Sequence, residues 1–370
     1  MITSPIVVAG AGPVGLTAAL ALRLYGHPVT VFDAREPGAS DHDPRAVALS
    51  HGSRLILERL GAWTTIAATP VRRIVVSQQG GFGRARIDAA DHGIDALGHV
   101  VRLGALVGAL RATVAARGIE IRHGCELAAS TAVAAGARVR AGETELDASL
   151  VVRAEGGAGA NAALTKDYMQ TALVTEATPR AGHAGCAHER FTAEGPLALL
   201  PLESAMSVVW CMAPGRAARM LALDDTGFIA ALDAATRFCG LRWEHVSPRR
   251  DYPLTLIRRA ADTHAREVAL GNAAQSLHPV AGQGLNLGLR DAFELSQALE
   301  DGVDGPALER YRRRRRVDRD AIVALTDGYV SLFSNDLAPV RAARGLGLAM
   351  VDMLPPLRAR IARRMMFGAR

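Results

Sequence analysis

The hydrophobic pattern at the start of the chain predicts a strand, a helix and a second strand in quick succession. Residues 5–10, PIVVAG, form a continuous apolar run, as a parallel strand covered on both faces requires. Residues 16–26, LTAALALRLYG, repeat apolar residues at helical spacing and stop at a glycine, and residues 27–33, HPVTVFD, form a second apolar run that ends in an acid. The glycine loop GAGPVG at 10–15 joins the first strand to the helix. This order is that of a βαβ unit.

Each polar or glycine position in this unit fits the binding of a dinucleotide. Gly10 permits the tight turn, Gly12 lets the backbone approach a pyrophosphate, and Gly15 allows close contact between helix and strand. The helix N-terminus then directs free N–H groups at the phosphates. Asp33 is placed to accept hydrogen bonds from the adenosine ribose, and its charge would repel a 2′-phosphate. The unit therefore predicts FAD or NAD and disfavours NADP.

The pattern changes after this unit, from alternating strand and helix to mainly strands. Residues 71–88 read as two strands with a turn, 100–118 as a helix, and 167–253 as short strands interrupted by a helix at 224–238. Beyond Ala292 the periodicity is helical. We expect an α/β fold, with a Rossmann-like nucleotide-binding domain, an inserted mainly antiparallel sheet that binds substrate, and a C-terminal basic helical region. The expected divisions are 1–70, 99–160 and 262–320 for the first domain, 71–98 and 161–261 for the second, and 321–370 for the tail.

A second glycine-rich stretch, GNAAQSLHPVAGQGLNLGLRDA at 271–292, also runs into a predicted helix. Two such loops far apart in sequence indicate one long ligand held at both ends. The alternative is an ordinary turn between two elements, although a turn alone does not require so many glycines around His278 and Pro279.

Composition is that of a globular protein of about two domains. The chain has 370 residues, 49% of them hydrophobic, and a mean hydropathy of +0.12. No apolar run reaches the roughly 18 residues of a membrane span, and the N-terminus reads as a strand rather than a signal peptide. The four cysteines form no CxxC pair, which favours reduced thiols in the cytoplasm and argues against a disulfide reductase. We expect no metal site and no nucleic-acid partner.

Several stretches together resemble a known family. DPRAVALS at 43–50, DYMQTALV at 167–174, ERFTAEGPLALLPL at 189–202 and the stretch at 271–292 are similar to the UbiH-like ubiquinone-biosynthesis hydroxylases (the UbiH/UbiF/VisC family). These belong to the single-component FAD-dependent aromatic hydroxylases, whose prototype is p-hydroxybenzoate hydroxylase. The resemblance extends from Ile6 to about Asp320. It implies the prototype's fold, with FAD between a Rossmann-like domain and an antiparallel sheet.

The resemblance also implies an activity. FAD would be reduced by NAD(P)H, a transient co-substrate, and O₂ would then form a C4a-hydroperoxyflavin that hydroxylates the ring of a polyprenylated phenol on the route to ubiquinone. The protein would supply no nucleophile, but would position the ring, favour the phenolate and exclude water. Other readings remain open: a hydroxylase of another aromatic metabolite, a flavin-dependent reductase of isoprenoid lipids, or an idle FAD-binding partner of other ubiquinone-biosynthesis enzymes.

Individual roles carry over at the matching positions. Arg45 would support the FAD diphosphate, Arg102 would begin a helix that contacts the flavin, and Asn272 would contact the ribityl or phosphate region. Backbone N–H groups before a helix that begins near Leu287 would face the flavin's N1–C2=O edge, from Gly282, Gln283, Gly284, Leu285 and Asn286. His278 and Pro279 are the candidate catalytic residues, with a packed histidine beside the ring as the alternative.

Two further features bear on the substrate side. Where the family reads Gly-Ala-Asp-Gly, this chain reads RAEG, and Arg153 adds bulk that puts the local fit to FAD in doubt. Gln170, Thr171 and Trp210 are strand residues that could line a substrate pocket, although ordinary sheet packing explains them equally well.

The formal net charge of +6 is unevenly placed. Residues 341–370 hold seven arginines and a single acid, Asp352, among many apolar side chains, and YRRRRRVDRD at 311–320 is a second basic cluster. One interpretation is a helical tail packed on the nucleotide-binding domain. The other is a cationic, apolar surface that rests on anionic lipid, which suits a water-insoluble polyprenyl substrate. We therefore expect a cytoplasmic protein, peripheral on the inner face of the membrane in the second case.

Overall fold

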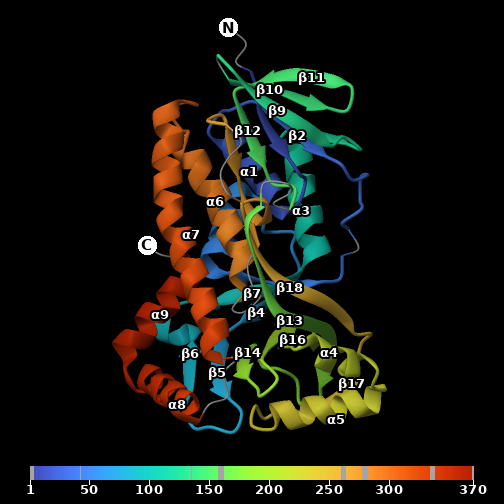
Figure 1. Ribbon diagram of the computed structural model, residues 1–370, viewed down its shortest axis with the longest axis vertical. Helices are drawn as coiled ribbons and strands as arrows, with labels where there is room; N and C mark the ends of the chain where they lie inside the picture. The colour runs from blue at the N-terminus through green and yellow to red at the C-terminus, as the bar shows by residue number, and fades with distance from the viewer. Residues whose placement is uncertain are drawn as a thin grey trace.

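The computed structural model describes residues 4–41, 43–134, 136–156, 162–259, 264–276, 282–333 and 338–368. Its elements form two assemblies stacked along the long axis (Figure 1). A parallel sheet with its helices lies in one half and a large, mainly antiparallel sheet in the other, with a long C-terminal helix running alongside both. This is the α/β fold expected from the sequence.

The first assembly is built on a parallel sheet. Its strand order is β19 (Glu267–Ala269), β12 (Leu150–Arg153), β1 (Ile6–Ala9), β2 (Val29–Asp33) and β8 (Glu120–His123). Both faces are covered, because alternate residues of β1 enter different clusters. Ile6 and Val8 pack with α1 (Pro13–Leu24), α3 (Leu103–Ala116) and α6 (Gln283–Ala298), while Val7 and Ala9 pack with β9 (Leu127–Val133), β10 (Gly136–Ala141) and β11 (Thr144–Ala148). Double coverage explains the continuous apolar run.

A small antiparallel sheet joins this assembly to the next. It consists of β3 (Ala46–Ser50), β7 (Gly98–Arg102) and β4 (Ala68–Val71), and β3 leads directly into α2 (His51–Leu60). The helix begins where the Ser50 side chain accepts a hydrogen bond from the Ser53 N–H, and it ends at Gly61, whose φ is +78°. The sequence analysis did not predict this helix.

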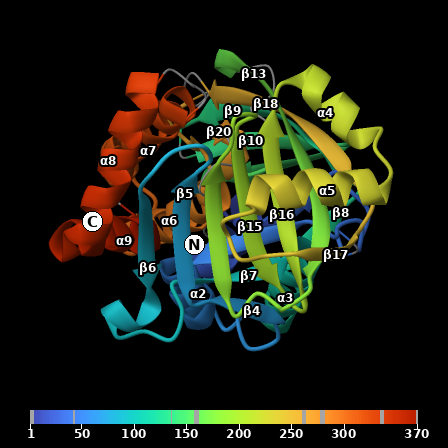
Figure 2. The ribbon, with the colours of Figure 1, turned by 90° about the horizontal axis from the view of Figure 1, so that it is seen from below.

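The second assembly is a nine-stranded sheet. Its main order is β20 (Gln275–Ser276), β18 (Arg250–Arg259), β13 (Ala162–Pro179), β16 (Ala205–Met212), β15 (Pro196–Leu202), β14 (Cys186–Phe191), β5 (Arg73–Gln78) and β6 (Arg84–Asp88), with β17 (Trp243–Val246) beside β13. All pairs are antiparallel except β14 with β5. Helices α4 (Pro214–Leu221) and α5 (Asp225–Thr236) cover one face of it (Figure 2). We call this the outer face and the opposite one the inner face.

The C-terminal helices are α7 (Gly305–Phe333), α8 (Ala338–Met353) and α9 (Pro355–Phe367). Part of the basic cluster at 311–320 is internal: Arg315 is almost fully buried and pairs with Asp291 and Glu294 of α6 and with Asp318. The prediction that residues 311–320 form a basic surface is therefore wrong for Arg315. Its partners Asp291 and Glu294 lie on α6, and their position beside Arg315 could not be predicted from the sequence.

Helix α9 packs in part, but against both expected divisions and not only against the nucleotide-binding one. Met366 is buried, and Met365 and Phe367 pack with it against Ile87 and Leu97, which lie in the division expected to bind substrate. The Phe367 ring also contacts the His51 ring of α2 edge-on, with 5.7 Å between the ring centroids. Within the described ranges, no helix combines the length and the hydropathy needed to cross a membrane.

Candidate cofactor and active site

The first glycine loop has the geometry that its glycines predict. Gly10 has a φ of +101°, and a Cβ added to it would lie 2.5 Å from the Ala154 carbonyl oxygen. A Cβ on Gly15 would overlap the Gly10 carbonyl oxygen, so helix and strand are in close contact. A Cβ on Gly12 would meet no protein atom within 4 Å. The loop is thus tight on its protein side and open at Gly12, as a cradle for a pyrophosphate must be.

Helix α1 begins at Pro13 with Gly12 as its N-cap, and no side chain caps it. First-turn N–H groups therefore remain available to phosphate oxygens, and the helix dipole adds a partial positive charge at the same place. The residues present fit the diphosphate of FAD.

Asp33 ends β2 and is almost fully buried, but its charge is not free. Its carboxylate accepts hydrogen bonds from the Ala11 N–H at 2.5 Å and from the Arg35 guanidinium at 2.8 Å. Burial alone would raise the pKa of Asp33, but the hydrogen bonds from Arg35 and Ala11 outweigh it and lower the pKa. Because Arg35 compensates the charge of Asp33, this carboxylate gives no reason to disfavour a 2′-phosphate, and hence NADP.

The second loop leads into α6, which begins at Gln283 and not near Leu287. Gly282 is its N-cap, with a φ of +58° and no side-chain cap, so Gln283, Gly284 and Leu285 form the first turn. The glycines of this stretch predicted a loop, but Gly284 lies in the first turn of the helix. The turn tolerates this glycine because the Asn286 side chain stabilises the start of α6. Its amide donates to the Gly282 carbonyl at 2.7 Å and to the Ala48 carbonyl at 2.9 Å.

Asn286 thus holds the helix in place. Its side-chain oxygen also accepts hydrogen bonds from the Ser50 N–H and the Ser53 hydroxyl. Two donated and two accepted bonds use its full capacity. The Asn286 side chain is therefore structural, and only the backbone of this turn is left for a ligand.

The two glycine loops meet at Val14. A Cβ added to Gly288 would lie 2.7 Å from Val14 Cγ2, and one added to Gly271 would lie 3.0 Å from the same atom. Two helix N-termini, each without a side-chain cap, therefore belong to one packed unit. This is the geometry expected of one long ligand held at two points.

Other predicted cofactor residues are engaged with protein partners. Arg45 is half exposed and pairs with Asp43 at 2.6 Å. Arg102 precedes α3 as expected, but its guanidinium pairs with Glu176 of β13 at 2.7 Å and with Glu203 at 2.9 Å. Arg102 thus links the parallel-sheet assembly to the large sheet.

The remaining sequence candidates fall in two groups. Asn272 is exposed, in the short 3-10 helix Gly271–Ala273. His278 and Pro279 lie outside the described residues. Trp210 packs on the outer face with α4 and α5, and Thr171 shares that face, as ordinary sheet packing expects; Gln170 lies on the inner face.

The Arg153 side chain of the RAEG segment is accommodated away from the first glycine loop. Arg153 ends β12, and its guanidinium bonds Glu155 at 2.7 Å, the Leu127 carbonyl at 2.9 Å and Glu267 at 3.2 Å. The backbone of Ala154 and Glu155, and not the Arg153 side chain, lies against Gly10. The extra bulk of Arg153 is thus taken up by neighbouring strands and does not crowd the first glycine loop.

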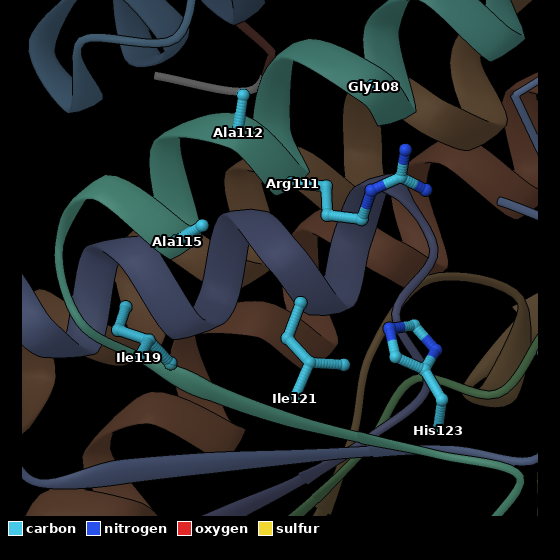
Figure 3. A pocket seen from close by; sticks show the side chains of 7 residues that line it. All are labelled: Gly108, Arg111, Ala112, Ala115, Ile119, Ile121 and His123. Carbon is cyan, nitrogen blue, oxygen red and sulfur yellow. The ribbon is translucent and has the colours of Figure 1, made fainter. Parts of the chain in front are cut away.

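A pocket of about 360 Å³ lies between α3 and β8, at the edge of the parallel sheet (Figure 3). His123 brings it close to the turn after β2, since its Nδ1 is 3.3 Å from the Arg35 carbonyl oxygen. None of the predicted cofactor residues lines this pocket, so we assign it no part in the site. Among the described residues, no three His, Cys, Asp or Glu side chains gather as a metal site would require.

Comparisons with known proteins agree with this geometry. Residues 3–325 match the FAD binding domain family. Ubiquinone hydroxylase UbiL of Rhodospirillum rubrum is 34% identical over 95% of this chain and 87% of its own length. The 3-demethoxyubiquinol 3-hydroxylase of Escherichia coli K12 is 30% identical over 94% of each chain.

The fold is shared with solved structures at lower identity. The p-nitrophenol 4-monooxygenase PnpA of Pseudomonas putida DLL-E4 superposes with a TM-score of 0.80 at 18% identity, covering 100% of this chain and 99% of its own. The match of the family over most of the chain, and the full-length relatives at 30% identity or more, decide the assignment. The chain belongs to the FAD-binding domain family, within its branch of UbiH-like ubiquinone-biosynthesis hydroxylases.

Proposed function

We propose that this FAD-dependent monooxygenase hydroxylates the aromatic ring of a polyprenylated phenol in ubiquinone biosynthesis, with NAD(P)H and O₂ as co-substrates. The observation that carries the proposal is the 34% identity to a ubiquinone hydroxylase along nearly the whole chain. The meeting of the two glycine loops at Val14 supports the cofactor part, because it brings two open helix N-termini into one unit.

The residues that would hold FAD follow from the geometry. The backbone around Gly12 and the first turn of α1 would bind the diphosphate, Asp33 with Arg35 would face the ribose, and the first turn of α6 would bind the flavin edge. When bound, FAD supplies the chemistry of reducing O₂ and delivering one of its oxygen atoms.

The inner face of the large sheet suits an aromatic substrate. Ala172, Cys211 and Leu254 form an apolar cluster there, with Val174 and Val209 packed against it. Apolar walls exclude water and accept a ring without competing hydrogen bonds. We accordingly keep the expected division of the chain, with FAD on the parallel-sheet assembly and substrate against the large sheet.

We also propose a membrane-facing surface at the tip of α8 and α9, here called the apolar tip. Three of its exposed side chains recur on one face of α8, and the others lie at the start of α9 and in the β5–β6 turn. In chain order they are Phe82, Leu346, Met350, Met353, Leu354 and Leu357. The same elements carry exposed arginines, Arg84 in β6 and Arg360, Arg363 and Arg364 in α9. A concentrated apolar patch with arginines on the same elements fits an anionic lipid surface.

The metabolic test of the function is quinone-intermediate profiling of a strain that lacks the gene. We expect a polyprenylated phenol or methoxyphenol to accumulate and the ubiquinone pool to fall. An unchanged ubiquinone pool, with another aromatic compound accumulating, would move the assignment to a different aromatic hydroxylase.

The membrane proposal is tested by flotation with liposomes that contain anionic lipid. The variant Met353→Ser/Leu357→Ser should bind less than the parent protein while it keeps FAD. The control is Phe238→Ser, which removes an equally exposed apolar side chain beyond the end of α5. Equal binding of all three proteins, or binding to neutral vesicles at high salt, would contradict the proposal.

A further inference from the structure

Glu189 is a carboxylate on the inner face of the large sheet that belongs neither to the proposed FAD site nor to the apolar cluster. It lies in β14, where side chains alternate between the two faces. Arg190 points to the outer face and donates to the Ala235 carbonyl of α5 at 2.6 Å. Ala187, two residues before Glu189, packs on the inner side with Val71 and Val100 of the small sheet. Glu189 therefore faces the assembly that would carry FAD.

The neighbours of Glu189 on this face are mostly apolar. It is in register with Ala198 of β15 and Val76 of β5, and Ala198 is in turn in register with Val209 of β16. Cys211 lies one position further along β16 on the same face. Glu189 thus borders the apolar cluster against which we place the aromatic ring.

One oxygen of the carboxylate is left without a protein partner, although the side chain as a whole is partly exposed. Its Oε1 is closed off from solvent and has no hydrogen-bond partner among the described residues. Burial raises the pKa of Glu189 to about 7. An unpartnered polar atom in such a place is costly and calls for an explanation, and a ligand hydroxyl provides one.

Charged groups on the neighbouring elements do not compensate it. Arg344 of α8 donates to Gln78 Oε1, Arg102 is held by Glu176 and Glu203, and Arg216 pairs with Glu194. The titratable group that senses Glu189 is the Cys211 thiol, whose pKa is raised by burial and further by the nearby carboxylate.

We propose that Glu189 is a catalytic residue that accepts the proton of the substrate's phenolic hydroxyl. The inference rests on the proposed function, since a phenol must be the substrate. The phenolic O–H bond breaks, the proton bonds to the Glu189 carboxylate, and the oxygen keeps the electron pair that activates the ring. After oxygen transfer, the substituted ring carbon loses its own proton to water. Glu189 then returns its proton to the phenolic oxygen, which regenerates the carboxylate and an aromatic product.

A base of this kind contributes about 10²- to 10⁴-fold to rate. The test compares the parent holoenzyme with Glu189→Gln, Glu189→Asp and the control Glu244→Gln, a half-exposed carboxylate of β17 in the same sheet. The substrates are a short-chain prenylphenol and a ring-fluorinated analogue of lower pKa, and the readouts are hydroxylated product, kcat against pH, and FAD retained.

We expect Glu189→Gln to keep FAD, to lower kcat about 10²-fold or more near pH 7, and to lose the inflection near that pH. The defect should shrink with the acidic phenol and at a pH near the phenol's own pKa of about 10, because the substrate then ionises unaided. Glu189→Asp should recover part of the rate, and Glu244→Gln should match the parent.

A Glu189→Gln enzyme with the parent's pH profile, or with a defect independent of phenol acidity, would overturn the role of Glu189 alone. A parent enzyme that forms no hydroxylated product from either phenol would instead refute the proposed function, and the role of Glu189 with it.

Discussion

The contact between the two glycine loops predicts opposite effects for two alanine substitutions in the same helix. Gly284 and Gly288 both lie in α6. A Cβ on Gly284 would meet no atom within 4 Å, whereas one on Gly288 would lie 2.7 Å from Val14 Cγ2 and 3.1 Å from Gly271 Cα. Alanine is favoured over glycine inside a helix by about 1 kcal/mol, and overpacking costs about 1–3 kcal/mol.

Gly284→Ala should therefore raise the free energy of unfolding by up to about 1 kcal/mol relative to the parent protein. Gly288→Ala should lower the same free energy by about 1–3 kcal/mol. Urea unfolding followed by tryptophan fluorescence measures both. FAD affinity, from flavin fluorescence, should fall in both variants for different reasons: Gly284→Ala intrudes on the flavin side, and Gly288→Ala displaces the loops.

A third variant isolates the contact. Val14→Ala removes the methyl groups that Gly288→Ala would strike, so the double variant should be more stable than the sum of the single effects by about 0.5–3 kcal/mol. Additive effects, or a Gly288→Ala protein as stable as Gly284→Ala, would refute the claim that the loops meet at Val14.

Three further outcomes follow from the same structure. Gly12→Leu should leave the fold intact, because a Cβ there meets no protein atom, yet give a colourless protein; a yellow variant would contradict the diphosphate site. Arg315→Met should cost about 3–5 kcal/mol in urea unfolding, because it removes a buried partner of Asp291, Glu294 and Asp318, although Asp291 keeps its pair with Arg319. Arg314→Met, at an exposed position, should cost no more than about 1 kcal/mol. Burial raises the pKa of Glu189 from 4.5 to about 7, so the folded protein holds this proton more tightly than the unfolded chain, and stability is lost as pH rises across that interval. Glu189→Gln should lack this loss and be more stable than the parent at pH 8; parallel stability–pH curves would count against a buried carboxyl.

The glycine loops could be predicted from sequence because a glycine encodes backbone geometry directly. Gly10 and Gly15 do what their spacing requires, since a side chain at either position would strike the backbone. The start of α6 was predicted too late in the chain, because glycine is accepted in a first helical turn as well as in a loop. The Asn286 side chain that stabilises this turn also bonds Ser50 and Ala48, which are far away in sequence.

The ion-pair partners of the arginines could not be predicted in this way. Arg45, Arg102 and Arg315 each pair with acids, and for Arg102 and Arg315 these include acids on other elements. A charged residue shows its partner only once the chain has folded. The side of the sheet on which Trp210 lies could not be predicted either. Both faces of its strand carry apolar residues, so the strand lacks the alternation of apolar and polar residues that would show which face is buried.

The reaction assigned to this chain is the insertion of an oxygen atom from O₂ into a phenolic ring. The direct measurement is mass spectrometry of the product formed by the purified holoenzyme from a prenylphenol, NAD(P)H and ¹⁸O₂. We expect a hydroxylated ring that carries one ¹⁸O atom. A product with no ¹⁸O, or one saturated in its isoprenoid tail, would contradict it.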